Sequence, residues 1–120
     1  MAMSLLTYDA AAMLRANGLL QKTVKGTRRE MDFHPVAKLH VPGTGAVWLL
    51  TEIDPDEPDI AFGLADLGMG FPELGSVSLS ELEAVGKNLG FAVETDHTFV
   101  ADRPLSAYAR EARQLGRISA

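Results

Sequence analysis

The sequence predicts an α+β fold, in which a small antiparallel sheet of four to five strands forms a meander and about three helices accompany it in a single domain. Its 120 residues, 47% hydrophobic and 22% charged, match one ordinary globular domain. Apolar segments rich in β-forming residues, at 36–41, 47–53 and 60–65, follow one another across short breaks. No repeat, low-complexity tract or linker divides residues 1–120. We therefore expect one folded unit.

A helix is expected near the start of the chain. Thr7 or Asp9 can cap it, and the run 10–16 consists of strong helix formers. We expect this helix to end at Asn17-Gly18, because both residue types tolerate the positive φ angles of a helix terminus.

The following stretch, 19–33, has poor periodicity and is predicted as a mobile basic loop. It carries Lys22, Lys25, Arg28 and Arg29, four bases within eight residues that can contact phosphates. Three bases near the end of the chain can assist them: Arg110, Arg113 and Arg117. However, the pI is about 5.1 and no aromatic residue interleaves with the bases. Direct nucleic-acid binding is therefore a less favoured function than protein binding.

The middle of the chain is predicted to form the sheet. Pro42–Gly45 breaks the first hairpin, and the turn 54–59 contains two prolines that forbid ladder pairing. Three sequential strands at this spacing predict an antiparallel meander with Trp48 and Phe62 in or near the core. A short fourth strand is expected at 73–77.

The second and third helices have clear start signals. Ser78 and Glu81 have the spacing of a capping box, so a helix is expected after Ser78 with its stop at 88–90. A closing helix is expected over 105–115, with Pro104 in its first turn and an Arg-rich tail completing residues 104–120.

A last strand is expected between these two helices. Residues 91–100 contain enough β-branched and aromatic residues for it, and Asp96-His97 is its weak point. This strand would bring the predicted sheet to five.

The formal net charge of −5 hides a strong partition along the chain. Residues 1–40 carry a net charge of +3, residues 41–100 carry −10 and residues 101–120 carry +2. Such asymmetry can mark a charged partner, but basic ends that fold over an acidic middle would reduce self-repulsion without any ligand. We favour the internal interpretation and keep the partner as the alternative.

The most acidic segment is a turn that places four carboxylates within six residues: Asp54, Asp56, Glu57 and Asp59. These oxygens could attract Ca²⁺ or Mg²⁺. An EF-hand loop counted from Asp54 would need glycine at its sixth position and glutamate at its twelfth, where this chain has Asp59 and Ala65. We therefore expect a solvated turn and no metal site.

Catalytic patterns are weak throughout the sequence. It has no cysteine, and His34, His40 and His97 lack the spacing of zinc ligands. No G-x-S-x-G elbow or phosphate-binding glycine loop is present. A triad built from Ser78, His97 and an acid is disfavoured because Ser78 already serves as a helix cap. We predict no catalytic residue and no cofactor, and we lean against an enzyme while leaving the question open.

Three segments carry a resemblance to a known family: Trp48-x-x-x-Glu52-x-Asp54, Phe62-Gly63-Leu64, and Pro72-Glu73-Leu74-Gly75-x-x-Ser78-Leu79-Ser80-Glu81-Leu82-Glu83. The chain resembles the uncharacterised bacterial family called domain of unknown function 2958, over roughly residues 5–105. The resemblance implies an α+β fold and a setting on plasmids and other mobile elements. It carries over no activity and no catalytic residue.

We expect a non-enzymatic accessory or regulatory protein of a bacterial mobile element that binds a macromolecule, most simply a protein, through a charged surface. The candidate binding residues are those of the acidic turn and of the segment that carries the resemblance: Trp48, Glu52, Asp54, Asp56, Glu57, Asp59 and Glu73. One alternative is an acidic inhibitor that mimics nucleic acid and blocks a host defence system. Another is a small ligand-binding domain or enzyme in which Glu52, Glu73 and His97 converge around a cleft.

A cytoplasmic location is expected. No apolar run approaches the ~20 residues of a membrane helix, and the start of the chain lacks the features of a secretory signal. We therefore expect no membrane partner.

Overall fold

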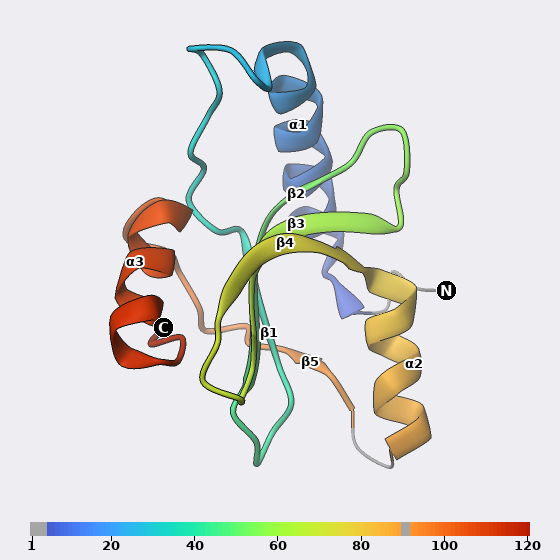
Figure 1. Ribbon diagram of the computed structural model, residues 1–120. Helices are drawn as coiled ribbons and strands as arrows, with labels where there is room; N and C mark the ends of the chain where they lie inside the picture. Colours follow the sequence, from blue (N-terminus) through green and yellow to red (C-terminus); the bar gives the residue numbers. More distant parts are fainter. Residues whose placement is uncertain (1–4, 90–91) are drawn as a thin grey trace.

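A computed structural model describes residues 5–89 and 92–120, of which residues 85–89 are described by their backbone alone. The chain forms three helices and five strands in these parts, arranged as in Figure 1. In chain order they are α1 (Tyr8–Val24), β1 (Ala37–His40), β2 (Ala46–Ile53), β3 (Ile60–Leu67), β4 (Glu73–Ser78), α2 (Leu79–Leu89), β5 (Glu94–Thr95) and α3 (Leu105–Leu115). The predicted α+β class is confirmed. Gly90 and Phe91, expected in a turn and a strand start, lie outside the described residues.

The sheet has the order β4-β3-β2-β1-β5, and every neighbouring pair is antiparallel. Strands β1 to β4 therefore form the predicted meander. The chain then passes through α2 and returns to the opposite edge, where β5 pairs with β1. Consequently β4 lies at one edge of the sheet and the two-residue strand β5 lies at the other.

Helices cover both faces of this sheet and bury two separate cores. On one face, α1 and α2 pack against the sheet around the side chains of Leu14, Trp48 and Leu79. On the other face, α3 packs around Leu49 and Tyr108. Trp48 is buried as predicted, whereas the half-buried Phe62 packs at the margin of the second core.

Helix α1 does not end at Asn17-Gly18, as the sequence predicted, but continues to Val24. Gly18 is buried where the helix crosses the end of β2, and a Cβ at position 18 would lie 1.8 Å from the carbonyl oxygen of Ile53. Glycine is required here for close approach between helix and strand rather than as a helix stop. The predicted loop over 19–33 is therefore helical up to Val24.

Helix α2 begins as expected after Ser78, whose hydroxyl accepts a hydrogen bond from the backbone N–H of Glu81 at 3.2 Å. A second acceptor comes from the acidic turn, because the Asp59 carboxylate accepts hydrogen bonds from the Ser80 backbone N–H at 2.9 Å and from both serine hydroxyls. These contacts satisfy donors that a helix start leaves without intrahelical partners.

The last strand is much shorter than the predicted 91–100. Its pairing ends after Thr95, because the Asp96 carboxylate turns back to accept hydrogen bonds from the N–H and the hydroxyl of Thr98, at 2.9 and 2.6 Å. Such side-chain bonds compete with ladder pairing. Pro104 is the N-cap residue of α3 rather than a residue of its first turn.

Candidate functional site

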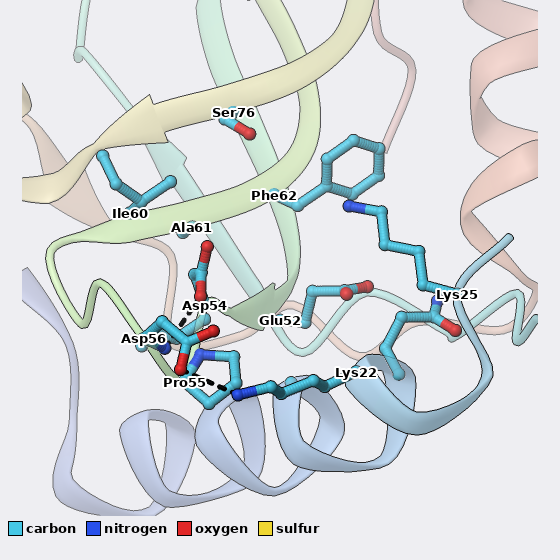
Figure 2. A pocket seen from close by; sticks show the side chains of 13 residues that line it. Lys22, Lys25, Glu52, Asp54, Pro55, Asp56, Ile60, Ala61, Phe62 and Ser76 are labelled. Atoms are coloured by element: carbon cyan, nitrogen blue, oxygen red, sulfur yellow. Dashed lines mark hydrogen bonds and ion pairs between the residues drawn. The ribbon is translucent and has the colours of Figure 1, made fainter.

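A cleft of about 210 Å³ lies between the C-terminal half of α1 and the ends of the central strands. Lys22 and Lys25 reach it from α1 and its C-terminal cap, and Phe62 and Ser76 reach it from β3 and β4 (Figure 2). Gln21 of α1 also lines it. The remaining walls come from Gly18, from the end of β2 with the acidic turn, and from the start of β3: Glu52, Ile53, Asp54, Pro55, Asp56, Ile60 and Ala61.

A bulge in β2 directs Glu52 to this cleft. Leu50 pairs with Gly63 and Glu52 pairs with Phe62, so Thr51 is an extra residue in the ladder. In a strand without the bulge, Glu52 would point to the same side as Leu50, into the core covered by α1. The extra residue shifts the alternation, because Ile53 and not Glu52 joins that core. The bulge thus leaves the carboxyl of Glu52 half-buried in the cleft.

Burial raises the pKa of the Glu52 carboxyl above its ordinary value, and the charge of Glu30 adds to this effect. Hydrogen bonding by Thr51 and Gln21 and the positive charge of Lys25 act in the opposite direction but do not cancel it. The carboxylate form is therefore less well solvated here than in water. In Figure 2 the Lys25 side chain runs above Glu52 toward the ring of Phe62.

The acidic turn forms one rim of the cleft. The Asp54 carboxylate accepts the N–H of Asp56 at 2.8 Å, an Asx-turn that fixes the loop. Asp56 pairs with Lys22 across the rim at 2.8 Å, and this contact raises the pKa of Lys22. Glu57 is exposed and does not line the cleft, and Asp59 is engaged in capping α2.

A second hollow adjoins the cleft and shares three lining residues with it, Gln21, Glu52 and Phe62. Gln21 fixes its wall, because the side-chain amide donates to the Met31 carbonyl at 2.8 Å and accepts the Met31 N–H at 2.9 Å. The segment between α1 and β1 is held at its far end by Asp32, which accepts hydrogen bonds from the N–H and hydroxyl of Ser106.

The structure does not bring the three residues of the predicted enzyme site together. Glu52 lines the cleft, whereas Glu73 is exposed at the far end of β4, opposite Ala65. His97 is exposed beside a different hollow next to β5. Trp48, which we also expected near a site, is buried in the core beneath α1 and α2 and does not line the cleft. Of the candidate binding residues, only Glu52, Asp54 and Asp56 share this cleft.

Ion pairs join the basic ends of the chain to its acidic middle. Lys22 pairs with Asp56 at 2.8 Å, and Lys38 pairs with Asp96 at 3.4 Å. Other bases are exposed on the C-terminal cap of α1, on the loop after it and on α3 or just beyond it: Lys25, Arg28, Arg29, Arg110, Arg113 and Arg117. Part of the charge partition is thus internal to the fold, while the remaining bases face solvent.

Several cleft residues were not among those predicted for a site, and Gln21 and Phe62 are two of them. A signal for Gln21 is present in the sequence, because polar Asn17 and Gln21 stand four residues apart on the same helical face as buried Leu14. Polar side chains at core positions usually have buried partners. Phe62 gives no comparable signal, because only the bulge places it beside Glu52.

The chemistry that these side chains support is cation recognition. Across residues 5–89 and 92–120, no group of three or more His, Asp or Glu side chains is arranged to hold a metal ion. The residues that line the cleft include a half-buried carboxyl, an aromatic ring and two lysines, but no histidine. A carboxylate and an aromatic face are both favourable contacts for an ammonium or guanidinium group.

Comparisons with known proteins identify a family for this chain. A family model described as "Protein of unknown function (DUF2958)" matches residues 5–119, nearly the whole chain. No curated protein and no solved structure matches. In the part of the chain that the structure describes, no helix is both long and apolar enough to cross a bilayer.

Proposed function

The chain belongs to the DUF2958 family, and because that family's description names no activity, we propose a function from the cleft: a non-enzymatic binding protein that accepts a basic side chain of a protein partner. The observation that supports this proposal is the Glu52 carboxyl, which is half-buried in the cleft and has a raised pKa because of burial. Lys25 offsets only part of this burial effect, and a guanidinium or ammonium group of a partner would add to that compensation.

The cleft by itself, without the adjoining hollow of about 290 Å³, has a size that suits a single side chain. Sites for small molecules and cofactors usually enclose about 300–1,000 Å³, and this cleft has about 210 Å³. Asp54 on the rim adds negative charge beside the Lys22–Asp56 ion pair. Phe62 adds an aromatic surface against which a cation can stack.

The alternatives have less support from the geometry. An enzyme that used Glu52, Glu73 and His97 would require these side chains to converge, and they line different parts of the surface. An acidic mimic of nucleic acid would use the acidic turn, in which Asp56 is neutralised by Lys22 and Asp59 caps α2. In our proposal the protein is an accessory factor of a mobile element, and the cleft is where it contacts its partner.

A small probe tests the cleft by itself. We expect N-acetyl-arginine methylamide, titrated into the ¹⁵N-labelled protein, to shift the amide signals of Glu52, Phe62 and Lys25. Glu52→Gln should weaken binding by about tenfold or more, since a hydrogen bond to a charged group is worth about 1.5–3 kcal/mol.

Glu57→Gln is the matched control, because it removes one negative charge from the turn outside the cleft. The difference between the two variants reports the cleft rather than net charge. Equal affinity in the two variants, or shifts confined to another surface, would contradict the proposal.

A further inference from the structure

The outer edge of β4 is an unpaired sheet edge. Strand β4 stands last in the sheet order, and within the described residues no other strand pairs with its outer side. The N–H of Leu79 donates to the carbonyl of Asp59 at 2.8 Å, which marks these opposed residues as a hydrogen-bonded pair. In an antiparallel ladder such pairs alternate with pairs whose backbone groups point outward. With the register of β3 and β4, the outward-pointing residues in the body of β4 are Leu74 and Ser76.

This edge lacks the usual devices that discourage strand addition. Sheet edges are commonly protected by proline, lysine or a covering element. Between Glu73 and Ser78 the strand carries neither proline nor lysine, and its one charged residue is Glu73 at its start. The Leu74 side chain is 44% exposed, so an added strand would also cover apolar surface.

A row of cross-strand neighbours connects this edge with the cleft. Ser76 pairs with Phe62, and Phe62 pairs with Glu52, so the three residues cross β4, β3 and β2 side by side. All three line the cleft. Neighbouring strands are about 4.8 Å apart, which places a strand added to β4 about 14 Å from the backbone of Glu52. A lysine or arginine side chain on the added strand and the Glu52 side chain can together span this separation along the row.

From this juxtaposition we propose that a basic, extended segment of a partner protein adds to β4 as a sixth strand and places a lysine or arginine over Phe62 toward Glu52, where it takes the place of the exposed Lys25 side chain. The inference rests on the proposed function and specifies how the basic side chain is presented. Backbone pairing at Leu74 and Ser76 supplies the alignment, and the carboxylates at Glu52 and Asp54 supply the charge complementarity. Asp56 is already paired with Lys22. A second copy of this chain fits less well, because β4 carries no basic side chain to offer.

Synthetic peptides of defined chemistry test the proposal. The probe is (Thr-Lys)₄, a β-forming peptide with lysines on one face, compared with (Thr-Glu)₄ and with (Thr-Lys)₄ N-methylated at alternate residues. We expect (Thr-Lys)₄ to bind and to slow hydrogen exchange at the amides of Leu74 and Ser76, which solvent reaches in the free protein. The acidic and the N-methylated peptides should each bind at least tenfold more weakly.

A proline substitution tests the same edge from the side of the protein. Ser76→Pro removes an N–H that points away from β3, so the internal ladder keeps its hydrogen bonds. Ser76→Ala removes the same hydroxyl but keeps the N–H. We expect Ser76→Pro to bind (Thr-Lys)₄ at least tenfold more weakly than Ser76→Ala. Unchanged exchange at Gly75 and Val77 would verify that β3–β4 pairing survives.

The outcomes separate this inference from the proposed function. If N-acetyl-arginine methylamide binds in a Glu52-dependent manner but the N-methylated peptide binds as well as (Thr-Lys)₄, strand addition is wrong and the cleft proposal stands. If edge protection appears with (Thr-Lys)₄ but Glu52→Gln binds equally, the role of the cleft is wrong. Protection of Leu74 and Ser76 that rises with protein concentration alone would assign the edge to a second copy and overturn the inference.

Discussion

The side-chain amide of Asn17 donates a hydrogen bond of 2.9 Å to the backbone carbonyl of Thr51, joining the middle of α1 to the bulged residue of β2. Both residues are buried. The residue that follows Asn17 in α1 is Gly18 and the residue that follows Thr51 in β2 is Glu52, and both line the cleft. The contact therefore connects the helix crossing with the bulge that aims Glu52. Asn17 positions the site without lining it.

We expect Asn17→Ala to destabilise the protein by about 1–3 kcal/mol, because the buried Thr51 carbonyl would lose this partner. Urea unfolding followed by circular dichroism measures the change. Arg15→Ala, on the exposed side of the same helix, is the control and should alter the unfolding free energy by less than about 0.5 kcal/mol. Equal effects of the two substitutions would show that the contact has no special role.

The Gly18→Ala substitution tests the close approach of α1 to β2 through the sign of the change in the free energy of unfolding. If Gly18 were only a weak point in a helix, alanine would stabilise the protein by about 1 kcal/mol. Because a Cβ would lie 1.8 Å from the carbonyl oxygen of Ile53, we expect destabilisation of about 1–3 kcal/mol instead. Thermal unfolding of the variant beside the wild type distinguishes the two, and a higher melting temperature would contradict the close approach.

Glu52→Gln should change how stability depends on pH. Because the folded-state pKa of Glu52 is raised above the ordinary 4.5, the carboxyl binds its proton more tightly in the folded protein than in the unfolded chain. The contribution of the Glu52 carboxyl to folding stability is thus most favourable below pH 4.5, and it is lost as the pH rises through the folded-state pKa. We expect the variant to match the wild type at pH 4 and to be more stable at pH 7. Urea unfolding at both pH values tests this, and a less stable variant at pH 7 would contradict it.

Asp96 should show the opposite dependence on pH. Hydrogen bonds from Thr98 and, to a lesser extent, the contact with Lys38 lower the pKa of Asp96 from 3.8 to about 2. A carboxylate with a lowered folded-state pKa contributes stability above its unfolded value and loses it as the pH falls. Asp96→Asn should therefore be less stable than the wild type at pH 6, and the difference should shrink between pH 4 and pH 2. If the stability difference between Asp96→Asn and the wild type stayed constant over this range, the loss of stability would come from packing rather than from the charge of Asp96.

Asp66 anchors the end of the chain to the β3–β4 turn. Its carboxylate is 1% exposed and accepts hydrogen bonds from the backbone N–H groups of Gly68 and Ile118, at 2.8 and 2.9 Å. Asp66→Ala leaves both donors without this acceptor and should cost about 2–5 kcal/mol. We also expect faster hydrogen exchange at Ile118 than at Leu64. Retained protection at Ile118 would show that another group holds the end of the chain.

Much of the fold could be predicted from local sequence. Alternating apolar segments separated by prolines and glycines predicted the meander, and the spacing of Ser78 and Glu81 predicted the start of α2. The closing helix was predicted with its observed bounds, Leu105–Leu115. These features depend on contacts between residues close in sequence, so their signals are local. The last strand was predicted too long, because the Asp96 carboxylate accepts the backbone N–H of Thr98 and so takes a donor that a longer ladder would require.

The candidate site was predictable only in part. Glu52, Asp54 and Asp56 stood out as acids, but nothing local separated them from Glu73 or Glu57. Asn17-Gly18 has the composition of a helix terminus, and only the strand packed against it turns that pair into a crossing point.

The sequence by itself determined the α+β class, the order of the meander and the division into basic ends and an acidic middle. The tertiary structure decided which of those charges form ion pairs within the fold and which line a cleft. The physical reason is that the cleft depends on contacts across 34 positions of the chain, between Lys22 and Asp56 and between Asn17 and Thr51. The Thr51 bulge adds a register shift that no local pattern specifies.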